Sequence, residues 1–168
     1  MTSVFKGKAH VYGDNIDTDR IIPGKYTKTL DTSQLAAHVL EDLDPDFAER
    51  VQAGDILVAG DNFGCGSSRE QAPLALQTAG ISVVVAKSFA RIFYRNAINI
   101  GLPLVEVREH DIQDEARLEV NLLEGKVTDE NSGQSYRATK MPEVMLEILR
   151  AGGLVNYLKE HGNYGRVT

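Results

Sequence analysis

Residues 64–70 combine side-chain types that can hold and activate a small anion. In order, they are Gly64, Cys65, Gly66, Ser67, Ser68, Arg69 and Glu70. Glycine lets the backbone approach a ligand closely, hydroxyl groups donate hydrogen bonds, and a guanidinium grips a carboxylate through two parallel bonds. The segment therefore predicts a cradle for a carboxylate or a phosphate group.

The same segment joins a strand-like apolar run to a predicted helix at 69–78. Gly80 suits the C-cap of this helix, and Ser67 and Ser68 are N-cap candidates. Ligands bind at such junctions in α/β folds because the first helical N–H groups are unpaired and carry partial positive charge. A capped helix after a glycine turn, with Arg69 paired to a nearby acid, explains the spacing equally well.

Other loop chemistries fit this segment less well. No Gly-Lys-Ser or Gly-Lys-Thr follows, which excludes a Walker A loop, and Arg69 stands where a dinucleotide fingerprint has its third glycine. A helix N-terminus favours a reactive thiolate, so Cys65 is a candidate nucleophile. No histidine stands near it in the sequence to act as a base, so we favour a Cys65 that only lines the loop.

The composition narrows the function classes. The chain has 168 residues, which suits one domain over 1–168, and its net charge of -6 without a basic block argues against nucleic acid as a partner. Its single cysteine cannot alone hold zinc or an iron–sulfur cluster. The four histidines are far apart in sequence: His10, His38, His110 and His161. We therefore expect no metal site on this chain.

Membrane and export signals are not recognisable in this sequence. No apolar run is long enough to span a bilayer, and residues 1–10 lack the apolar core of a signal peptide. We expect a cytoplasmic protein with no membrane partner.

The pattern of apolar residues predicts an α/β domain. Three apolar runs alternate with two helical patterns, which is typical of parallel βαβ units. The strands are expected at 56–59, 81–86 and 102–107, and the helices at 69–78 and 89–100, the second capped by Ser88.

The flanking regions predict further elements around this unit. A strand is expected at 4–12, a loop at 13–20, a helix from Asp31 with Leu35, Val39 and Leu43 on one face, a short helix from Pro45 to Val51, meander strands at 117–122, 126–128 and 134–138, and helices at 142–149 and 154–159. The whole predicts a mixed, partly parallel sheet flanked by helices.

Three segments carry a resemblance to a known family. Residues 12–23 read YGDNIDTDRIIP, residues 64–73 read GCGSSREQAP, and residues 87–96 read KSFARIFYRN, followed by GLPL at 101–104. In this order they resemble the signature segments of the aconitase superfamily swivel domain. Within that superfamily, the length and opening of the chain resemble the small subunits of the 3-isopropylmalate dehydratase and homoaconitase group. The resemblance implies a single swivelling β/β/α-type domain.

The resemblance also implies an activity and a partner. It implies a hydro-lyase that isomerises 2-isopropylmalate and 3-isopropylmalate by dehydration and rehydration in leucine biosynthesis. Such an enzyme works only with a large subunit that carries a [4Fe–4S] cluster. Homoaconitase and a dimethylmalate-type dehydratase, which also act on small di- or tricarboxylates, are alternatives, as is a non-catalytic anion-binding module. A homo-oligomer of the isolated chain is also left open.

Residue roles carry over from the same family. The resemblance makes Ser67 the base, as an alkoxide, and makes Gly66, Ser68 and Arg69 substrate-binding residues. A helix N-terminus, glycine amides and Arg69 would all favour the alkoxide anion.

The family also has a flexible loop that reads the variable substituent of the substrate. Here it falls on Tyr26, Thr27, Lys28 and Thr29. In this family an arginine there would suit a third carboxylate and an apolar loop would suit an isopropyl group. Lys28 offers a positive charge without the bidentate fork of arginine, so the identity of the substrate stays undecided. The alternative that Lys28 is simply a solvated surface lysine also remains.

Supporting roles are expected for four more residues. Asp17 and Asp19 are candidates to hydrogen-bond across the loop or to orient Arg20, against the alternative of ordinary turn chemistry. Arg91 lies four residues before Arg95 on one helix face, and we expect it to face the large subunit or the substrate, with a plain surface role as the alternative.

Overall fold

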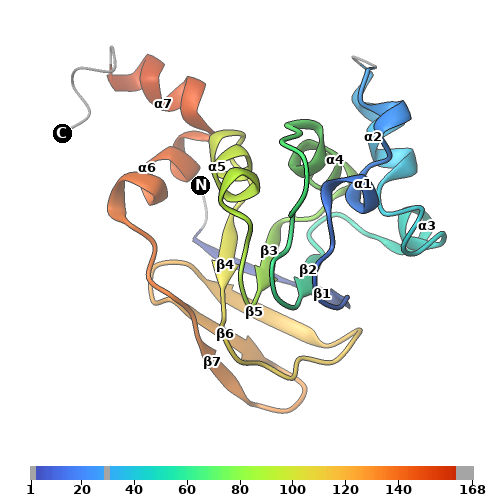
Figure 1. Ribbon diagram of the computed structural model, residues 1–168. Helices are drawn as coiled ribbons and strands as arrows, with labels where there is room; N and C mark the ends of the chain where they lie inside the picture. Colours follow the sequence, from blue (N-terminus) through green and yellow to red (C-terminus); the bar gives the residue numbers. More distant parts are fainter. Residues whose placement is uncertain (1–2, 29–30, 162–168) are drawn as a thin grey trace.

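The structure is a computed structural model that describes residues 3–28 and 31–161. Its strands form one mixed sheet in the order β4-β3-β2-β1-β5-β6-β7 (Figure 1). Neighbours from β4 to β1 pair in parallel, and neighbours from β1 to β7 pair antiparallel. This confirms the mixed, partly parallel sheet. The bounds are β1 (Val4–Val11), β2 (Ile56–Ala59), β3 (Val83–Ala86), β4 (Leu104–Glu106), β5 (Arg117–Asn121), β6 (Lys126–Asp129) and β7 (Ser135–Arg137).

Helices flank the parallel half of the sheet. In Figure 1, α1 to α4 lie toward one side of this half, α6 and α7 toward the other, and α5 between them. The bounds are α1 (Thr18–Ile21), the 3-10 helix η1 (Gly24–Tyr26), α2 (Thr32–His38), α3 (Phe47–Arg50), α4 (Gln71–Ala79), α5 (Arg91–Asn99), α6 (Glu143–Ala151) and α7 (Leu154–His161). No helix in the described ranges is long and apolar enough to cross a membrane.

Both faces of the parallel strands are buried, which explains their uninterrupted apolar runs. Leu57 of β2 and Val84 of β3 belong to one core cluster, which α2 to α5 complete. The next residues along, Val58 and Val85, belong to a second cluster, shared with β5, β6 and α6. The antiparallel strands therefore curl over the second face of the parallel strands.

The start of α4 differs from the prediction. The helix begins at Gln71 rather than Arg69, its N-cap is Glu70, and no side chain caps it. The prediction that Ser67 or Ser68 caps this helix was wrong. Tertiary hydrogen bonds from Thr18 and to Ile22 hold the residues before this point, and Pro73 in the first turn cannot donate an N–H.

Other boundaries also differ. The loop expected at 13–20 ends in a helical turn, α1, because the Asp17 carboxylate caps it by accepting from the Arg20 N–H at 2.9 Å. The helix from Asp31 ends at His38, because Val39 is extended and Leu40 has φ +57°, so both Val39 and Leu43 lie beyond it. Ser88 does not cap α5, whose N-cap is Ala90.

Candidate active site

Three loops follow the carboxyl ends of β1, β2 and β3, and backbone hydrogen bonds join them. On one side of the middle loop, the Gly64 N–H donates to the Ile16 carbonyl at 2.8 Å, and the Thr18 N–H donates to the Cys65 carbonyl at 2.9 Å. On its other side, the Phe63 N–H donates to the Ser88 carbonyl at 3.0 Å. The three segments singled out in the sequence therefore lie side by side at one edge of the sheet, where α/β proteins bind ligands.

Gly64 lets the middle loop pass close to α5. Its φ is +85°, and a Cβ placed on it would lie 2.2 Å from Cγ of Phe93. The Phe93 ring in turn packs edge to face against Phe63 at 5.2 Å between centroids. A side chain at position 64 is therefore excluded by both backbone conformation and space.

Ser67 and Ser68 are exposed on a loop whose backbone is held in place. The Thr18 hydroxyl donates to the Ser67 carbonyl at 3.0 Å, and both serines are exposed. Within residues 3–28 and 31–161, no partner hydrogen-bonds to either serine hydroxyl or to the backbone N–H of Ser67, Ser68 or Arg69. These unpaired donors, next to exposed Gly66, can receive an anion without breaking any bond of the fold.

Arg69 is paired with an acid, as the alternative interpretation expected. Its Nη1 lies 2.5 Å from Oδ1 of Asp19 and donates to the Ile22 carbonyl at 3.3 Å. The Arg69 side chain is 22% exposed and that of Asp19 is 65% exposed. Both bonds use Nη1, so the edge formed by Nε and Nη2 has no partner in the described part of the chain. That edge is the fork that grips a carboxylate, so Asp19 orients Arg69 without occupying it fully.

The remaining supporting residues lie around this centre. The Asp17 carboxylate is used in the turn, as the cap of α1, while Asp19 contacts Arg69 rather than Arg20. Arg20 and Arg91 are exposed, and neither side chain contacts a partner within the described ranges. Arg20 lies in α1 beside Asp19, and Arg91 is the first residue of α5.

The candidate substrate-reading loop lies against the start of α4. Gln71 Nε2 donates to the Thr27 carbonyl at 3.2 Å, and the Thr27 hydroxyl donates to the Gly24 carbonyl at 2.7 Å. The Tyr26 ring stacks on His38 with 3.8 Å between centroids. Lys28 is exposed, and Thr29 lies outside the described residues. Sequence reasoning missed Gln71, whose place inside the 64–73 segment was the available signal.

The residues of this chain do not fit an iron–sulfur cluster. Cys65, the only cysteine, supplies one thiolate where such a cluster needs several. Among the described residues, no three histidine, cysteine, aspartate or glutamate side chains lie where they could share a metal ion. Any cluster that this site uses has to be held by another chain.

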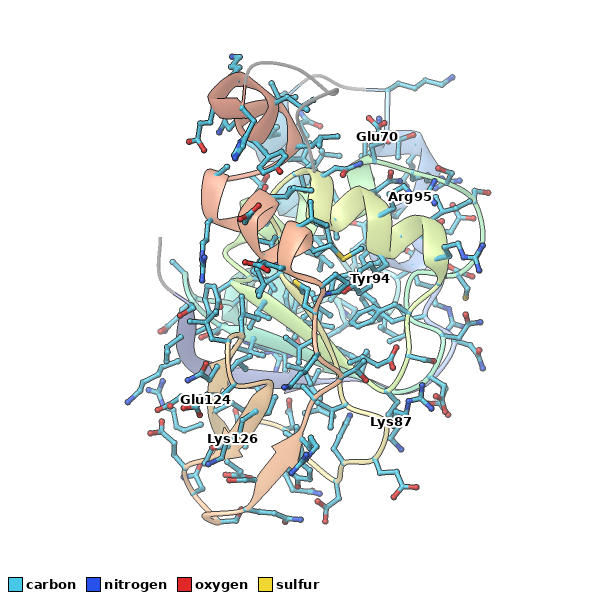
Figure 2. All side chains as sticks on the ribbon, turned by 90° about the vertical axis from the view of Figure 1, so that its left-hand side faces the viewer. Glu70, Lys87, Tyr94, Arg95, Glu124 and Lys126 are labelled. Carbon is cyan, nitrogen blue, oxygen red and sulfur yellow. The ribbon has the colours of Figure 1, made fainter. Side chains whose placement is uncertain are left out.

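A separate hollow of about 810 Å³ lies along β6 and β7 and is lined by Lys126 and Arg137 among others. Figure 2 places Glu70, which ends the loop, toward one end of the molecule and Glu124 and Lys126 toward the other. The hollow is therefore remote from Ser67 and Arg69.

Comparison with known proteins agrees with this geometry. Residues 5–109, which include all three loops, match the family described as the aconitase C-terminal domain. The chain belongs to this family. The match covers the three loops described above.

The similarity to individual relatives covers nearly the whole chain. The chain is 56% identical to the 3-isopropylmalate dehydratase small subunit of Caldicellulosiruptor bescii, over 93% of this chain and 95% of that protein. It is 54% identical to the 2,3-dimethylmalate dehydratase small subunit of Eubacterium barkeri, over 91% and 95%. The crystal structure of 3-isopropylmalate dehydratase from Methanocaldococcus jannaschii matches with a TM-score of 0.91, 47% identity and 95% coverage of both chains.

Proposed function

We propose that this chain is the small subunit of a heteromeric hydro-lyase that interconverts 2-isopropylmalate and 3-isopropylmalate in leucine biosynthesis. The observation that carries the proposal is the exposed loop with two unpaired serine hydroxyls beside Arg69. It stands in a chain that is similar over 93% of its length to a 3-isopropylmalate dehydratase small subunit. The interface with a large subunit, the cytoplasmic location and the residue roles below are parts of the same proposal.

Ser67 acts as the base in this proposal. Dehydration breaks the C–H bond beside a carboxylate and the C–O bond on the adjacent carbon; the C–H electron pair becomes the C=C bond, and the hydroxyl leaves as hydroxide. Ser67 Oγ, as an alkoxide, takes the proton and returns it on rehydration, and a Lewis acid on the large subunit would accept the hydroxide. A serine hydroxyl ionises near neutral pH only where its anion is strongly favoured. The unpaired N–H groups of the loop and the Arg69 guanidinium favour it here.

Arg69, Ser68 and Gly66 bind a substrate carboxylate. The Nε and Nη2 edge of Arg69 forms the fork, while the Ser68 hydroxyl and the backbone at Gly66 close the other side. Asp19 holds the guanidinium in place, and Asp17 fixes the α1 turn that carries Asp19. We place the [4Fe–4S] cluster on the large subunit, because this chain offers one thiolate.

The candidate substrates differ in one variable substituent, and this substituent separates the proposed substrate, isopropylmalate, from the alternatives. The Eubacterium barkeri relative supports 2,3-dimethylmalate as a second candidate substrate. Lys28 adds a positive charge near the loop, which favours neither branched alkyl group and would suit a third carboxylate. A panel of isopropylmalate, dimethylmalate and homocitrate, assayed on one purified complex, decides which of these substrates is used.

The test of the serine base uses the assembled enzyme. The chain is co-expressed with a candidate large subunit, the cluster is reconstituted without oxygen, and Ser67→Ala is compared with Ser135→Ala. Ser135 is an exposed serine on β7, far from the loop. Loss of general-base catalysis should lower kcat about 100- to 10,000-fold in Ser67→Ala alone, with assembly unchanged. Near-normal turnover of Ser67→Ala would remove Ser67 from this role.

A further inference from the structure

The turn at 24–27 is attached to the fold at two points, and the first is Gln71. Gln71 is the first residue of α4 and stands two positions after Arg69. Its side-chain amide donates to the Thr27 carbonyl at 3.2 Å. Arg69 contacts the same stretch of chain at the Ile22 carbonyl. The start of α4 therefore holds the turn and the carboxylate fork in one arrangement.

The second attachment is a stack of rings on α2. The Tyr26 ring lies parallel to His38, with 3.8 Å between centroids and 2° between planes. His38 Nδ1 lies 2.7 Å from Oε2 of Glu41. Burial by itself raises the pKa of Glu41, but hydrogen bonds from His38 and Tyr26 bring it below its usual value. Glu41 thus stays ionised and fixes the His38 ring under Tyr26.

These contacts change which part of the turn is free to meet a substrate. The Tyr26 ring stacks on His38, and the Thr27 hydroxyl donates to the Gly24 carbonyl. Of the candidate reading residues that the structure describes, Lys28 alone is exposed without a side-chain contact. The position of Lys28 is therefore set by the backbone of the residue before it, which Gln71 holds.

We propose that Gln71 is a positioning residue that fixes the substrate-reading turn relative to Arg69. This inference rests on the proposed function, because it assumes that the turn meets the variable end of the substrate. Gln71 contacts no reacting atom. It acts through the Thr27 carbonyl, so its loss should weaken the recognition of one substrate against another more than it slows the chemical step.

The matched comparison is between Gln71→Met and Gln77→Met. Gln77 lies in the same helix and makes the same kind of bond, from Nε2 to the Ile100 carbonyl at 3.1 Å, away from the turn. Methionine keeps the length and helix propensity of glutamine, removes the donor, and adds no charge beside Arg69.

The first measurement is amide hydrogen exchange in the isolated chain. We expect exchange at 24–28 to speed up about fivefold in Gln71→Met, the factor that one hydrogen bond of average net strength supplies. Gln77→Met should leave this segment unchanged. Unchanged exchange in Gln71→Met would overturn the inference, since the turn would then be held without this bond.

The second measurement is kinetic and uses the complex with the large subunit. In Gln71→Met we expect KM for the preferred substrate to rise about fivefold and its preference over dimethylmalate or isopropylmalate to fall, with kcat within about twofold of the wild type. Gln77→Met should keep the wild-type KM and preference. An active wild-type complex with an unchanged Gln71→Met variant overturns this inference alone. A wild-type complex that turns over no substrate in the panel overturns the proposed function and this inference with it.

Discussion

Arg69 serves the fold and the proposed chemistry with different parts of one guanidinium. Nη1 is bound to Asp19 and to the Ile22 carbonyl, and the opposite edge faces no partner within the described ranges. Planar, five-donor geometry allows this division of labour, which a single ammonium group cannot reproduce. We therefore propose that this position requires the geometry of arginine as well as its charge.

Arg69→Lys tests this requirement. Lysine keeps the charge but loses the fork, so we expect KM for the substrate to rise about 10- to 100-fold, the range for one charge-assisted hydrogen bond. Steady-state kinetics of the assembled enzyme measure this. Arg108→Lys is the control, because the exposed Arg108 side chain makes one ion pair among the described residues, with Glu106 at 3.4 Å. Equal KM values in the two variants would show that the fork is not used.

At the scale of elements, the loop between β2 and α4 is held by neighbours on both sides rather than by its own turn chemistry. The α1 segment bonds to it at Gly64, Cys65 and Ser67, and the segment after β3 bonds to it at Phe63. At Gly64, these hydrogen bonds bring the backbone of the loop against Phe93. Packing, more than local preference, determines the path of the loop.

Gly64→Ala should therefore destabilise more than an ordinary glycine replacement. Gly133 has a similar φ of +78° but open space around it. Gly133→Ala should cost only the strain of a left-handed alanine, about 1–2 kcal/mol, and Gly64→Ala should cost about 1–3 kcal/mol more because its Cβ overlaps Phe93. Denaturant unfolding of both variants measures the difference. Equal losses would mean that the loop moves away freely.

His110 links the strand β2 to the segment after β4 and makes stability depend on pH. Its Nε2 lies 3.0 Å from the Ala59 carbonyl, and burial lowers the pKa of His110 below 6.5. The unfolded chain then binds the proton more readily, so the stabilisation is present above pH 6.5 and is lost as pH falls through the lower folded value. We expect Tm to fall between pH 7.5 and pH 5.5 (about one unit to either side of the ordinary value). His110→Gln should flatten this slope and the exposed His161→Gln should keep it. An unchanged slope in His110→Gln would assign the pH dependence to other groups.

At the scale of the whole molecule, the candidate site is open on one side. Ser67 and Ser68 are exposed, as are the cationic side chains of Arg20, Arg91 and Arg95, although the chain carries a net charge of -6. Arg91 stands in the first turn of α5, where a positive charge opposes the helix dipole. A partner surface with acidic groups that covers these residues would bury the exposed serines and neutralise the exposed arginines, including Arg91.

Binding of the large subunit should slow amide exchange at these exposed residues and leave exchange at the far end of the sheet unchanged. We expect slower amide exchange at 64–70 and 91–95 in the complex, and no change at 126–137, because contact slows local opening only where it occurs. Exchange mass spectrometry of the chain with and without its partner measures this. Protection at 126–137 instead would place the interface on β6 and β7.

Much of the architecture followed from the sequence because it depends on short-range patterns. The apolar runs of β2 and β3 are buried on both faces, and the alternating residues of β5 and β6 lie in the curled part of the sheet, as their periodicity predicts. The candidate anion cradle at 64–70 was also a prediction from the sequence, because glycine, serine and arginine are residue types that can bind an anion wherever they lie together. The three family segments added named roles to these residues.

Only the tertiary structure decided how these residues are held. The start of α4 and the course of the loop depend on bonds between residues 47 to 49 positions apart, from Arg69 to Ile22 and from Thr18 to Ser67. Such bonds follow from which strands become neighbours, and no local propensity contains that information. The sequence by itself identified residues 64–70 as a candidate anion cradle. Tertiary contacts decided that its serines are exposed, that Asp19 orients its arginine, and that Gln71 ties the neighbouring turn to it.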